Sequence, residues 1–437
     1  MLTWDVVILG GGIAGLSTGA LLTKNGYRVL LVEAKSRLGG RANCQAHPSG
    51  FLVDWGIHSL RAGEAGVVAQ LFQQLGLKLD VAPSGEGLLF HEGQWFSLPT
   101  SVQALMATPL LTEEDRLAVG GLFGSIMSAK PEELLSTSVA TWLDNFKVSS
   151  TILWIFQLYS GLLLIEPDVT VASMGEMLDI MHKIIRSGKA AGYPRGGWRV
   201  ILQALREEIE KTGTIRLKAP ASQIHIEKDK VSAVQIGSDR ISCDTVVAAV
   251  PPDALLTILP ATNAASQKLI QQAKRLTPTA GVSIDMAFSE PITDAAGLIV
   301  CSEPFVMGQA TSNIDATVAP PEKQLITFYY PLSPEVVADE SKAKKALQQL
   351  ETLIQKMFPS APKPEWIRQL VLPIVDGTSP TIHQHRKNRL PIQTQIEGLY
   401  LAGDAHNAPG AGGDIAFNAA LACAEQITRL GINNRQD

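Results

Sequence analysis

The sequence has few charged residues and no concentration of charge of either sign. Charged residues make up 18% of the 437 residues, below the roughly 25% typical of soluble proteins, and the formal net charge is only −5. No run of five or six like charges occurs, so nothing resembles the basic footprint that binds a phosphate backbone. We therefore expect no nucleic-acid partner, and we expect an unusually apolar surface or pocket.

Cysteines are scarce and widely separated. The four cysteines are Cys44, Cys243, Cys301 and Cys423, and they include no Cys-x-x-Cys pair. This spacing predicts neither a disulfide framework nor a zinc cluster. A reducing compartment fits it best, so we expect a cytoplasmic protein.

The sequence also has little that resembles a secretory leader or a membrane span. The N-terminus shows no basic region and no small-residue cleavage site, so we expect no leader, and the run Val6 to Leu9 is typical of a first strand. Two stretches without charge, 93–112 and 148–165, are interrupted by prolines in the first and by serines and a glutamine in the second. Neither matches the roughly 20 apolar residues that cross a bilayer. A peripheral contact in the membrane interface stays open.

The first 33 residues predict a strand, a helix and a second strand joined by short turns. Asp5 to Leu9 has a buried-strand pattern, and Gly15 to Asn25 repeats its apolar residues at helical spacing before Gly26. Arg28 to Glu33 is a second apolar run. This order is typical of a parallel-sheet unit.

The turn between that strand and helix reads Gly10-Gly11-Gly12-Ile13-Ala14-Gly15, which is a Gly-x-Gly-x-x-Gly pattern. Its first glycine allows the tight turn, its second lets the backbone approach a pyrophosphate, and its third lets helix and strand pack closely. Glu33 ends the next strand eighteen residues after Gly15, where a carboxylate accepts hydrogen bonds from ribose hydroxyls. The predicted dinucleotide contacts here are Gly10, Gly12, Ile13, Ala14, Gly15 and Glu33.

Two further segments near the N-terminus carry candidate contacts. Arg37-Leu38-Gly39-Gly40-Arg41 combines glycines with an arginine whose forked guanidinium suits a phosphate. Gly50 to His58 is expected to bring another strand back to the site. The candidates from these segments are Gly40, Arg41, Gly56, Ile57 and His58.

The C-terminal part repeats the pattern of strand, glycine-rich turn and helix. The apolar run beginning at Gly398 ends in Gly403-Asp404, where a carboxylate would bind a polyol chain. Gly410 to Ile415 then leads into a helix expected over Ala416 to Ile427, whose first amides would point at an electron-rich oxygen. Gly403, Asp404, Gly413, Asp414 and Ile415 are the candidates here.

The middle of the chain mixes helix and strand signals. Residues 99–186 have mostly helical periodicity, and strands are expected over 215–226, 230–236, 245–250, 282–288, 324–330 and 370–375. We therefore predict an α/β protein with a discontinuous Rossmann-type nucleotide-binding domain and an inserted α+β substrate domain. The first would comprise 1–75, 190–275 and 385–437, and the second 76–189 and 276–384.

Taken together, these motifs resemble the flavin-dependent amine oxidase and phytoene desaturase superfamily, which includes protoporphyrinogen oxidase. The resemblance extends over nearly the whole chain, and its FAD motifs are more specific than its substrate region. The matching segments are Gly10 to Gly15, Glu33, Arg37 to Arg41, Asp54 to His58, Tyr193 to Gly197, Ala219 to Ile224, Asp244 to Pro251 and Leu399 to Ala424. The resemblance implies an FAD-dependent oxidoreductase.

The same resemblance implies a role for individual residues. Glu33 would hold the adenosine ribose, Arg41 the pyrophosphate, and Asp404 the ribityl or pyrophosphate end. Ala221, where the family often has valine, would contact the adenine through its backbone. The amides of Asp414 and Ile415 would face the flavin C2 carbonyl. By resemblance to the covalent amine oxidases, a flavin-linking cysteine would lie between Gly403 and Ile415. None lies there, so the FAD is expected to be noncovalent.

Departures from the family pattern bear on the substrate. Many amine oxidases of this group have a lysine on the strand expected here over 282–288, and an aromatic pair around the amine. This strand has no lysine, and no Tyr or Trp follows Gly403, so an aromatic cage is poorly supported. A His-Pro-Gly of the carotenoid desaturases is matched only in part by His406 to Gly410. We expect a small, largely apolar substrate, oxidised at C–C or C–N bonds by hydride transfer to flavin N5 as in phytoene desaturase or protoporphyrinogen oxidase. Oxygen or a quinone would be the acceptor, and the sequence indicates neither a catalytic base nor an oligomeric state.

Three alternatives remain at this point. They are a flavin amine or amino-acid oxidase, a redox-neutral FAD-dependent polyene isomerase, and a lipid-binding escort like the Rab GDP dissociation inhibitors. The set Glu33, Arg41 and Asp404 argues against the escort. The sequence has no second Gly-x-Gly-x-x-Gly pattern, so it does not indicate a separate NAD(P)H site. His383 and His385 are expected on one strand, but they have no clear third ligand nearby, so we expect no metal site.

Overall fold

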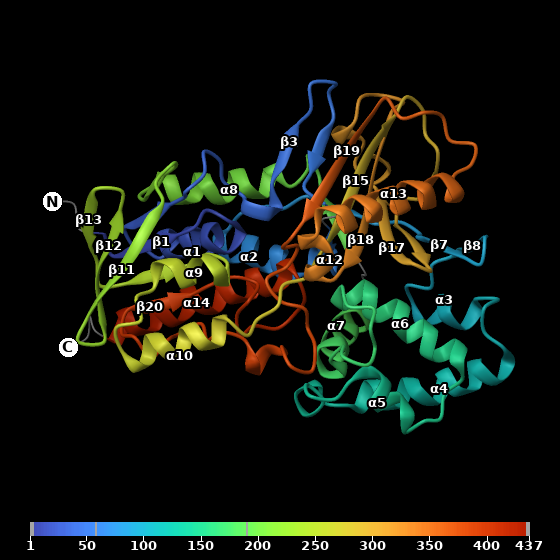
Figure 1. Cartoon of the computed structure of the whole chain (residues 1–437), viewed down its shortest axis with the longest axis horizontal. Coiled ribbons are helices and arrows are strands. Elements are labelled where there is room, and N and C mark those ends of the chain that lie inside the picture. The colour runs from blue at the N-terminus through green and yellow to red at the C-terminus, as the bar shows by residue number, and fades with distance from the viewer. Residues whose placement is uncertain (1–3, 57–58, 189–190, 434–437) are drawn as a thin grey trace.

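A computed structural model describes residues 4–56, 59–188 and 191–433. Figure 1 shows a parallel sheet with its helices in one half of the molecule, and a mostly antiparallel sheet above a group of helices in the other half. The α/β class predicted from the sequence is confirmed. The domain boundaries given above stay a prediction.

The parallel sheet has the strand order β10-β2-β1-β14-β20. Its strands are β1 (Val6–Leu9), β2 (Val29–Val32), β10 (Thr214–Arg216), β14 (Val246–Ala248) and β20 (Leu399–Leu401). Every neighbouring pair is parallel, with Val7 opposite Leu30 and Val246 opposite Leu399. The sheet therefore brings three distant stretches of chain together, and the carboxyl ends of β1, β2 and β20 lie at one edge.

Both faces of this sheet are covered, which explains why β1, β2, β14 and β20 are continuous apolar runs. On one face lie α1 (Ile13–Lys24), α2 (Val67–Leu75), α8 (Arg199–Glu210) and α14 (Gly413–Asn433). On the other lie the antiparallel strands β11 (Ala221–Glu227), β12 (Lys230–Ile236) and β13 (Asp239–Ser242), with α9 (Pro252–Ile258) and α10 (Ala264–Ala273).

The second sheet has seven strands in the order β19-β15-β18-β17-β16-β7-β8. They are β7 (Leu88–His91), β8 (Gln94–Ser97), β15 (Ala280–Phe288), β16 (Leu298–Ser302), β17 (Phe305–Ala310), β18 (Gln324–Leu332) and β19 (Trp366–Leu372). Helix α13 (Glu340–Met357) packs on one face of this sheet, against Val282, Ile284 and Met286. The short helix α12 (Pro334–Ala338) precedes it, and α11 (Thr311–Ile314) follows β17.

The helical part below the seven-stranded sheet in Figure 1 agrees with the predicted helical periodicity of residues 99–186. Its helices are α3 (Val102–Ala107), α4 (Glu113–Ser128), α5 (Val139–Asp144), α6 (Ser150–Leu164) and α7 (Met174–Ser187). Thr112 forms a capping box with Asp115, and Ser149 and Ser173 cap α6 and α7 through their hydroxyl groups, as expected for N-cap residues. Within the described residues, none of the helices is long and apolar enough to cross a membrane.

Shorter elements join these parts. They are β3 (Cys44–Ala46), β4 (Leu52–Asp54), β5 (Leu60–Arg61), β6 (Val81–Pro83), β9 (Ala191–Pro194) and the 3-10 turns η1 (Gly40–Ala42), η2 (Gly63–Ala65), η3 (Pro131–Glu133), η4 (Ala316–Val318) and η5 (Arg386–Asn388). The hairpin of β3 and β4 packs Phe51 and Val53 against Ala287 and Leu325 of the seven-stranded sheet. This contact joins the two halves of the molecule.

Three local expectations were wrong. The strand expected over 370–375 is β19, four residues earlier, because Arg368 and Gln369 interrupt the apolar run inside this edge strand. The strand expected over 215–226 is two strands in different sheets, separated by Lys218 with φ 53° and by Pro220. His383 and His385 lie in a loop and not on a strand, with His383 exposed and His385 buried.

Candidate cofactor site

The turn after β1 leaves an open space beside the first amides of α1. Gly10 has φ +105°, and a Cβ there would lie 2.4 Å from the Ala249 carbonyl oxygen. A Cβ on Gly15 would lie 2.0 Å from the carbonyl oxygen of Gly10, whereas at Gly12 no atom lies within 4 Å. Only glycine fits the first and third positions, and the second borders free space. A phosphate group can approach the N-terminus of α1 there.

Glu33 is held at this turn by backbone amides. Its Oε2 accepts a hydrogen bond from Gly11 N at 2.7 Å, and its Oε1 accepts one from Lys35 N at 2.8 Å. A carboxylate has about four acceptor sites, so capacity remains for ribose hydroxyls. The Glu33 carbonyl oxygen also accepts from Ala219 N at 2.9 Å. Ala221 begins β11 two residues after Ala219, so it lies near the backbone of Glu33.

Arg41 and Asp404 form a two-pronged ion pair. Arg41 Nη1 and Nη2 donate to the two carboxylate oxygens of Asp404 at 2.7 and 2.9 Å, and Gly377 N donates to Oδ2 at 2.8 Å. Burial alone would raise the pKa of Asp404, but the guanidinium and the amide together hold that pKa below its usual value. The expected phosphate-binding and polyol-binding residues thus lie together, at the edge where β20 ends.

Helix α14 begins three residues earlier than expected, at Gly413. A Cβ on Gly413 would lie 3.8 Å from Ile13 Cδ1, so α14 and α1 begin side by side. The amides of Asp414 and Ile415 donate within the turn, to the carbonyl oxygens of Ala411 at 3.3 Å and Gly412 at 3.1 Å. The positive end of the helix dipole still points toward the shared edge. The contact of these two amides with a flavin carbonyl stays a prediction.

The other residues predicted to contact the cofactor show fewer contacts that bear on the site. Gly40 lies in η1 with φ +56°, and Gly56 follows β4 with φ +94°. Ile57 and His58 lie outside the described residues. Gly403 has φ +152°, and a Cβ there would lie 3.2 Å from the His406 ring. Burial lowers the pKa of His406 to about 4, so its ring is neutral near pH 7.

The structure adds charged residues that sequence reasoning missed. Asp376 follows β19, and its carboxylate oxygen Oδ1 lies 2.9 Å from where a Cβ on Gly412 would stand. Arg61 Nη1 lies 3.9 Å from Asp414 Oδ2. Asp376 follows an apolar run, as Glu33 and Asp404 do, so the same criterion of a carboxylate at a strand end could have found it. No local pattern marks Arg61.

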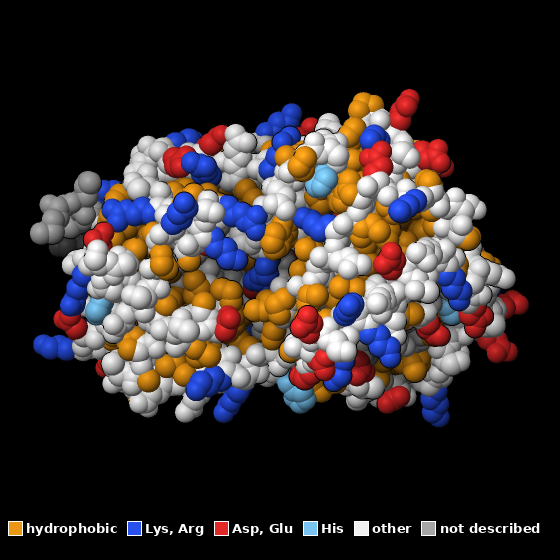
Figure 2. Space-filling view, turned by 45° about the horizontal axis from the view of Figure 1, so that its top comes forward, with side chains coloured by type: hydrophobic (Ala, Val, Ile, Leu, Met, Phe, Trp, Pro, Cys, Tyr) orange, Lys and Arg blue, Asp and Glu red, His pale blue; other side chains and the backbone are white. Residues whose placement is uncertain are grey.

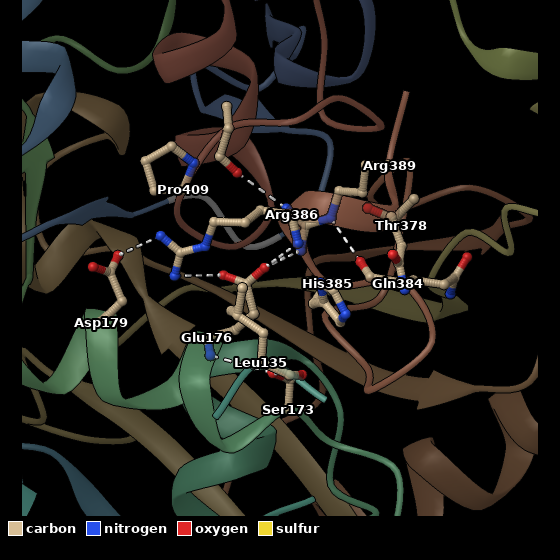
Figure 3. Close-up of polar contacts among 12 residues, drawn as sticks. Leu135, Ser173, Glu176, Asp179, Thr378, Gln384, His385, Arg386, Arg389 and Pro409 are labelled. Carbon is tan, nitrogen blue, oxygen red and sulfur yellow. Dashed lines mark hydrogen bonds and ion pairs between the residues drawn. The ribbon is translucent and has the colours of Figure 1, made fainter. Parts of the chain in front are cut away.

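A buried ion cluster fixes the loop that leads to this edge. We call residues 376–389 the crossing loop. Glu176 Oε1 on α7 accepts from Arg386 N at 2.6 Å and from Arg389 Nη2 at 3.0 Å, and its Oε2 lies 3.1 Å from Arg386 Nη2. Figure 3 shows these side chains converging on Glu176, with Asp179 at the far side of Arg386. Arg389 Nη1 also donates to the Ala408 carbonyl oxygen at 3.1 Å. The cluster therefore joins α7 to the segment between β20 and α14.

Backbone contacts reinforce that attachment. Ser173 N donates to the Pro380 carbonyl oxygen at 3.0 Å, and Ile382 N donates to the Val171 carbonyl oxygen at 2.9 Å. At its other end, the crossing loop supplies Gly377 N to Asp404. The helical part and the edge of the parallel sheet are thus connected through one stretch of chain.

The surface agrees with an anionic ligand. Figure 2 shows Lys and Arg side chains gathered across the left half of the face drawn, and around a hollow near its centre. Together with the open space at Gly12, the acceptor capacity of Glu33 and the guanidinium of Arg41, this suits a dinucleotide that carries a pyrophosphate and a ribose. The residues present fit FAD.

Comparisons with known proteins agree with this geometry. The family model for flavin containing amine oxidoreductases matches residues 13–428. A 15-cis-phytoene desaturase from Synechococcus elongatus is 22% identical over 438 aligned residues, covering 91% of this chain and 90% of that protein. The protoporphyrinogen oxidase of Bos taurus is 25% identical, but the match covers 59% of this chain and 61% of the bovine protein. The crystal structure of an oxidoreductase from Methanosarcina mazei superposes with a TM-score of 0.82 at 21% identity, covering 96% of this chain and 99% of that chain.

The site predicts that Glu33→Ala weakens FAD binding. Losing hydrogen bonds to a charged group costs about 1.5–3 kcal/mol, which corresponds to roughly a tenfold to hundredfold rise in the FAD dissociation constant. Titration of the apoprotein, followed by flavin fluorescence, measures it. Glu397→Ala is the matched control, because Glu397 is exposed and pairs with Lys230 at the opposite end of β20. An unchanged dissociation constant in Glu33→Ala would mean that the adenosine end is misplaced.

The ion cluster predicts a large loss of stability in Glu176→Ala. Removing one partner of a buried ion pair costs about 3–5 kcal/mol, because the remaining charges stay buried without compensation. Urea denaturation of the FAD-loaded protein measures the change in the free energy of unfolding. Glu133→Ala, which breaks only the exposed pair with Lys130, should cost no more than about 1 kcal/mol. Similar small losses in both variants would show that the cluster does not hold the crossing loop.

Proposed function

The chain belongs to the family of flavin containing amine oxidoreductases, and we propose that it dehydrogenates a small, largely apolar substrate. As a member of this family it is an FAD-dependent oxidoreductase. The finer proposal is that an isoprenoid-like or similarly apolar molecule would give a hydride from one C–H bond to flavin N5 and a proton from the neighbouring carbon to solvent, so that a C=C bond forms. Oxygen or a quinone would be the final acceptor of the two electrons. The match to a phytoene desaturase over most of both chains supports this substrate class.

The proposal rests mainly on the burial of β15 and on the residues that this strand carries. All nine of its residues are buried, and none is a lysine. Its face away from α13 carries Ser283 and Asp285, and both are engaged within the sheet: Ser283 Oγ donates to the Phe328 carbonyl oxygen at 2.9 Å, and Asp285 Oδ1 accepts from Thr327 Oγ1 at 2.7 Å. Arg368 Nε donates to Asp285 Oδ2 at 2.7 Å. This strand therefore offers no amine of its own, which favours an apolar substrate over a polar amine.

The same face of the sheet is tied to the predicted FAD domain. Arg368 bonds both to Asp285 and to the Asp54 carbonyl oxygen at the end of β4. Tyr193 Oη donates to Asp54 Oδ2 at 2.6 Å. A fixed distance between the substrate sheet and the cofactor side is what hydride transfer requires, because the reacting atoms must be held in contact.

In this scheme bound FAD supplies the hydride acceptor, and the residues of the chain bind, orient and exclude water. Glu33 and Arg41 hold the nucleotide end, and the buried sheet covers the reacting end. Burial and the neighbouring Asp54 carboxylate raise the pKa of the Cys44 thiol to about 12, so this cysteine stays protonated near pH 7. Cys44 is therefore a poor nucleophile and a poor site for covalent attachment of the flavin.

Anaerobic reduction of the bound flavin by a panel of compounds tests the substrate class. We expect a polyene to bleach the flavin absorbance faster than a polar amine or an amino acid, with a porphyrinogen as the second apolar candidate. Rapid bleaching by an amine, with none by polyenes or porphyrinogens, would assign the chain to the amine oxidases and contradict the proposal. Recovery of the absorbance with oxygen or with a quinone then identifies the acceptor.

We further propose that the protein is cytoplasmic and contacts membranes peripherally, since an apolar substrate partitions into the bilayer. The helical part exposes large apolar side chains: Val102 on α3, Leu117 on α4, Phe146 after α5 and Leu153 on α6. Leu117 is 76% exposed. Figure 1 places α3, α4, α5 and α6 together at one end of the molecule, away from α8.

Sedimentation with neutral and anionic liposomes measures this contact. We expect the wild-type protein to sediment in part with both, and Leu117→Asp to sediment several-fold less, because a charged side chain cannot enter the apolar interface. Val200→Asp is the matched control: Val200 is also exposed, but it lies on α8. A wild-type protein that remains wholly in the supernatant would refute the membrane contact, and equal losses in both variants would place the contact elsewhere.

A further inference from the structure

Asp376 lies at the start of α14, and neither the family match nor the proposed reaction assigns it a role. Its Oδ1 would be 2.9 Å from a Cβ on Gly412, the residue just before α14. Its main chain and side chain are fixed by Thr279: Asp376 N donates to Thr279 Oγ1 at 2.8 Å, and this hydroxyl donates to Asp376 Oδ2 at 3.3 Å. A third bond runs from Thr279 N to the Asp376 carbonyl oxygen at 3.1 Å. The carboxyl group is therefore held against the helix end.

Charged and titratable groups surround Asp376 from every element packed near it. Arg41 from η1 and Arg61 from β5 are the nearby cations, and Asp404 after β20 is the nearby anion. Tyr329 from β18 also senses the Asp376 charge, and Asp414 of α14 shares Arg61 with it. A further charge introduced beside α14 would interact at short range with Asp376 and with these neighbouring groups.

Burial and the neighbouring Asp404 carboxylate raise the pKa of Asp376 to about 6, while Arg41, Arg61 and the Thr279 hydroxyl oppose the rise. Below about pH 6 the carboxyl is therefore mostly neutral, and above it mostly ionised. Since additional negative charge nearby makes ionisation less favourable, such charge would move this pKa upward.

We propose that Asp376 takes up a proton when the flavin is reduced, and that it thereby sets the pH dependence of the flavin potential. The inference rests on the proposed function and on the predicted placement of the flavin carbonyl beside the amides of Asp414 and Ile415, at the start of α14. Hydride transfer brings two electrons and one proton to the flavin and adds one negative charge to it. A proton from solvent then neutralises the Asp376 carboxylate, and it returns to solvent when oxygen or a quinone removes the two electrons.

Reduction of the FAD-loaded protein by dithionite under anaerobic conditions tests this. A pH-indicator dye follows proton uptake, and a reference dye follows the flavin potential between pH 5 and pH 9. In the wild-type protein we expect additional proton uptake above about pH 6, which fades once the pH exceeds the higher pKa of the reduced state. Because dithionite replaces the substrate, the result does not depend on the substrate class proposed above, so the two proposals can fail separately.

Asp376→Asn should abolish the additional uptake. It should also raise the flavin potential at pH 8, where the wild-type carboxyl is ionised in the oxidised protein, and the two potentials should converge below pH 6, where it is neutral in both. Asp294→Asn, which alters an exposed loop carboxylate, is the control and should leave both profiles unchanged. Wild-type profiles in Asp376→Asn, or loss of the additional uptake in Asp414→Asn instead, would overturn the proposal.

A second measurement tests the proposal on the wild-type protein, so it still applies if Asp376→Asn folds poorly. The infrared difference spectrum of the wild-type protein, reduced minus oxidised, should gain the C=O stretching band of a protonated carboxyl group at pH 7. Thr279→Val removes the hydroxyl that donates to Asp376 Oδ2, so it should raise the pH at which that band disappears from the oxidised protein. Absence of the band on reduction of the wild-type protein would contradict the proposal without any variant.

Discussion

The burial of Glu176 between two arginines is the interaction on which the arrangement of the site depends. Glu176 and the Arg389 side chain are fully buried, and Arg386 is nearly so, so these charges are tolerable only while they remain paired. Arg386 and Arg389 end the crossing loop, and Gly377 near its start donates to Asp404. Holding α7 in place therefore also holds the Asp404 carboxylate, which in turn orients Arg41.

The edge where β1, β2 and β20 end has a charge balance suited to a ligand whose charge changes. The N-termini of α1 and α14 supply positive potential, and the guanidinium groups of Arg41 and Arg61 lie beside the carboxylates of Asp404 and Asp414. Asp376 and Asp414 add carboxyl groups whose pKa values are raised by burial. A site that binds a pyrophosphate and also senses the redox state of a flavin needs both features, and the same few residues provide them.

Sequence motifs predicted the parts of the site that follow local rules. Gly10 to Gly15, Glu33 and Asp404 each sit at the carboxyl end of an apolar strand, and the structure places all three at one edge. Residues that act through long-range contacts were missed: Glu176 is 210 positions from Arg386, and no periodicity links them. The start of β19 was missed because Arg368 and Gln369 interrupt its apolar run. The spacing of His383 and His385 predicts a strand from the sequence alone. In the structure both residues lie in the crossing loop, which the ion cluster holds in place.

An experimental structure of the protein with FAD bound tests this arrangement of the site most directly. We expect the adenosine ribose on the Glu33 carboxylate, the pyrophosphate in the open space at Gly12 with Arg41 beside it, and the flavin ring next to Gly412 and Asp376, below the buried face of β15. A flavin ring far from the start of α14, or a ribose that does not contact Glu33, would contradict it.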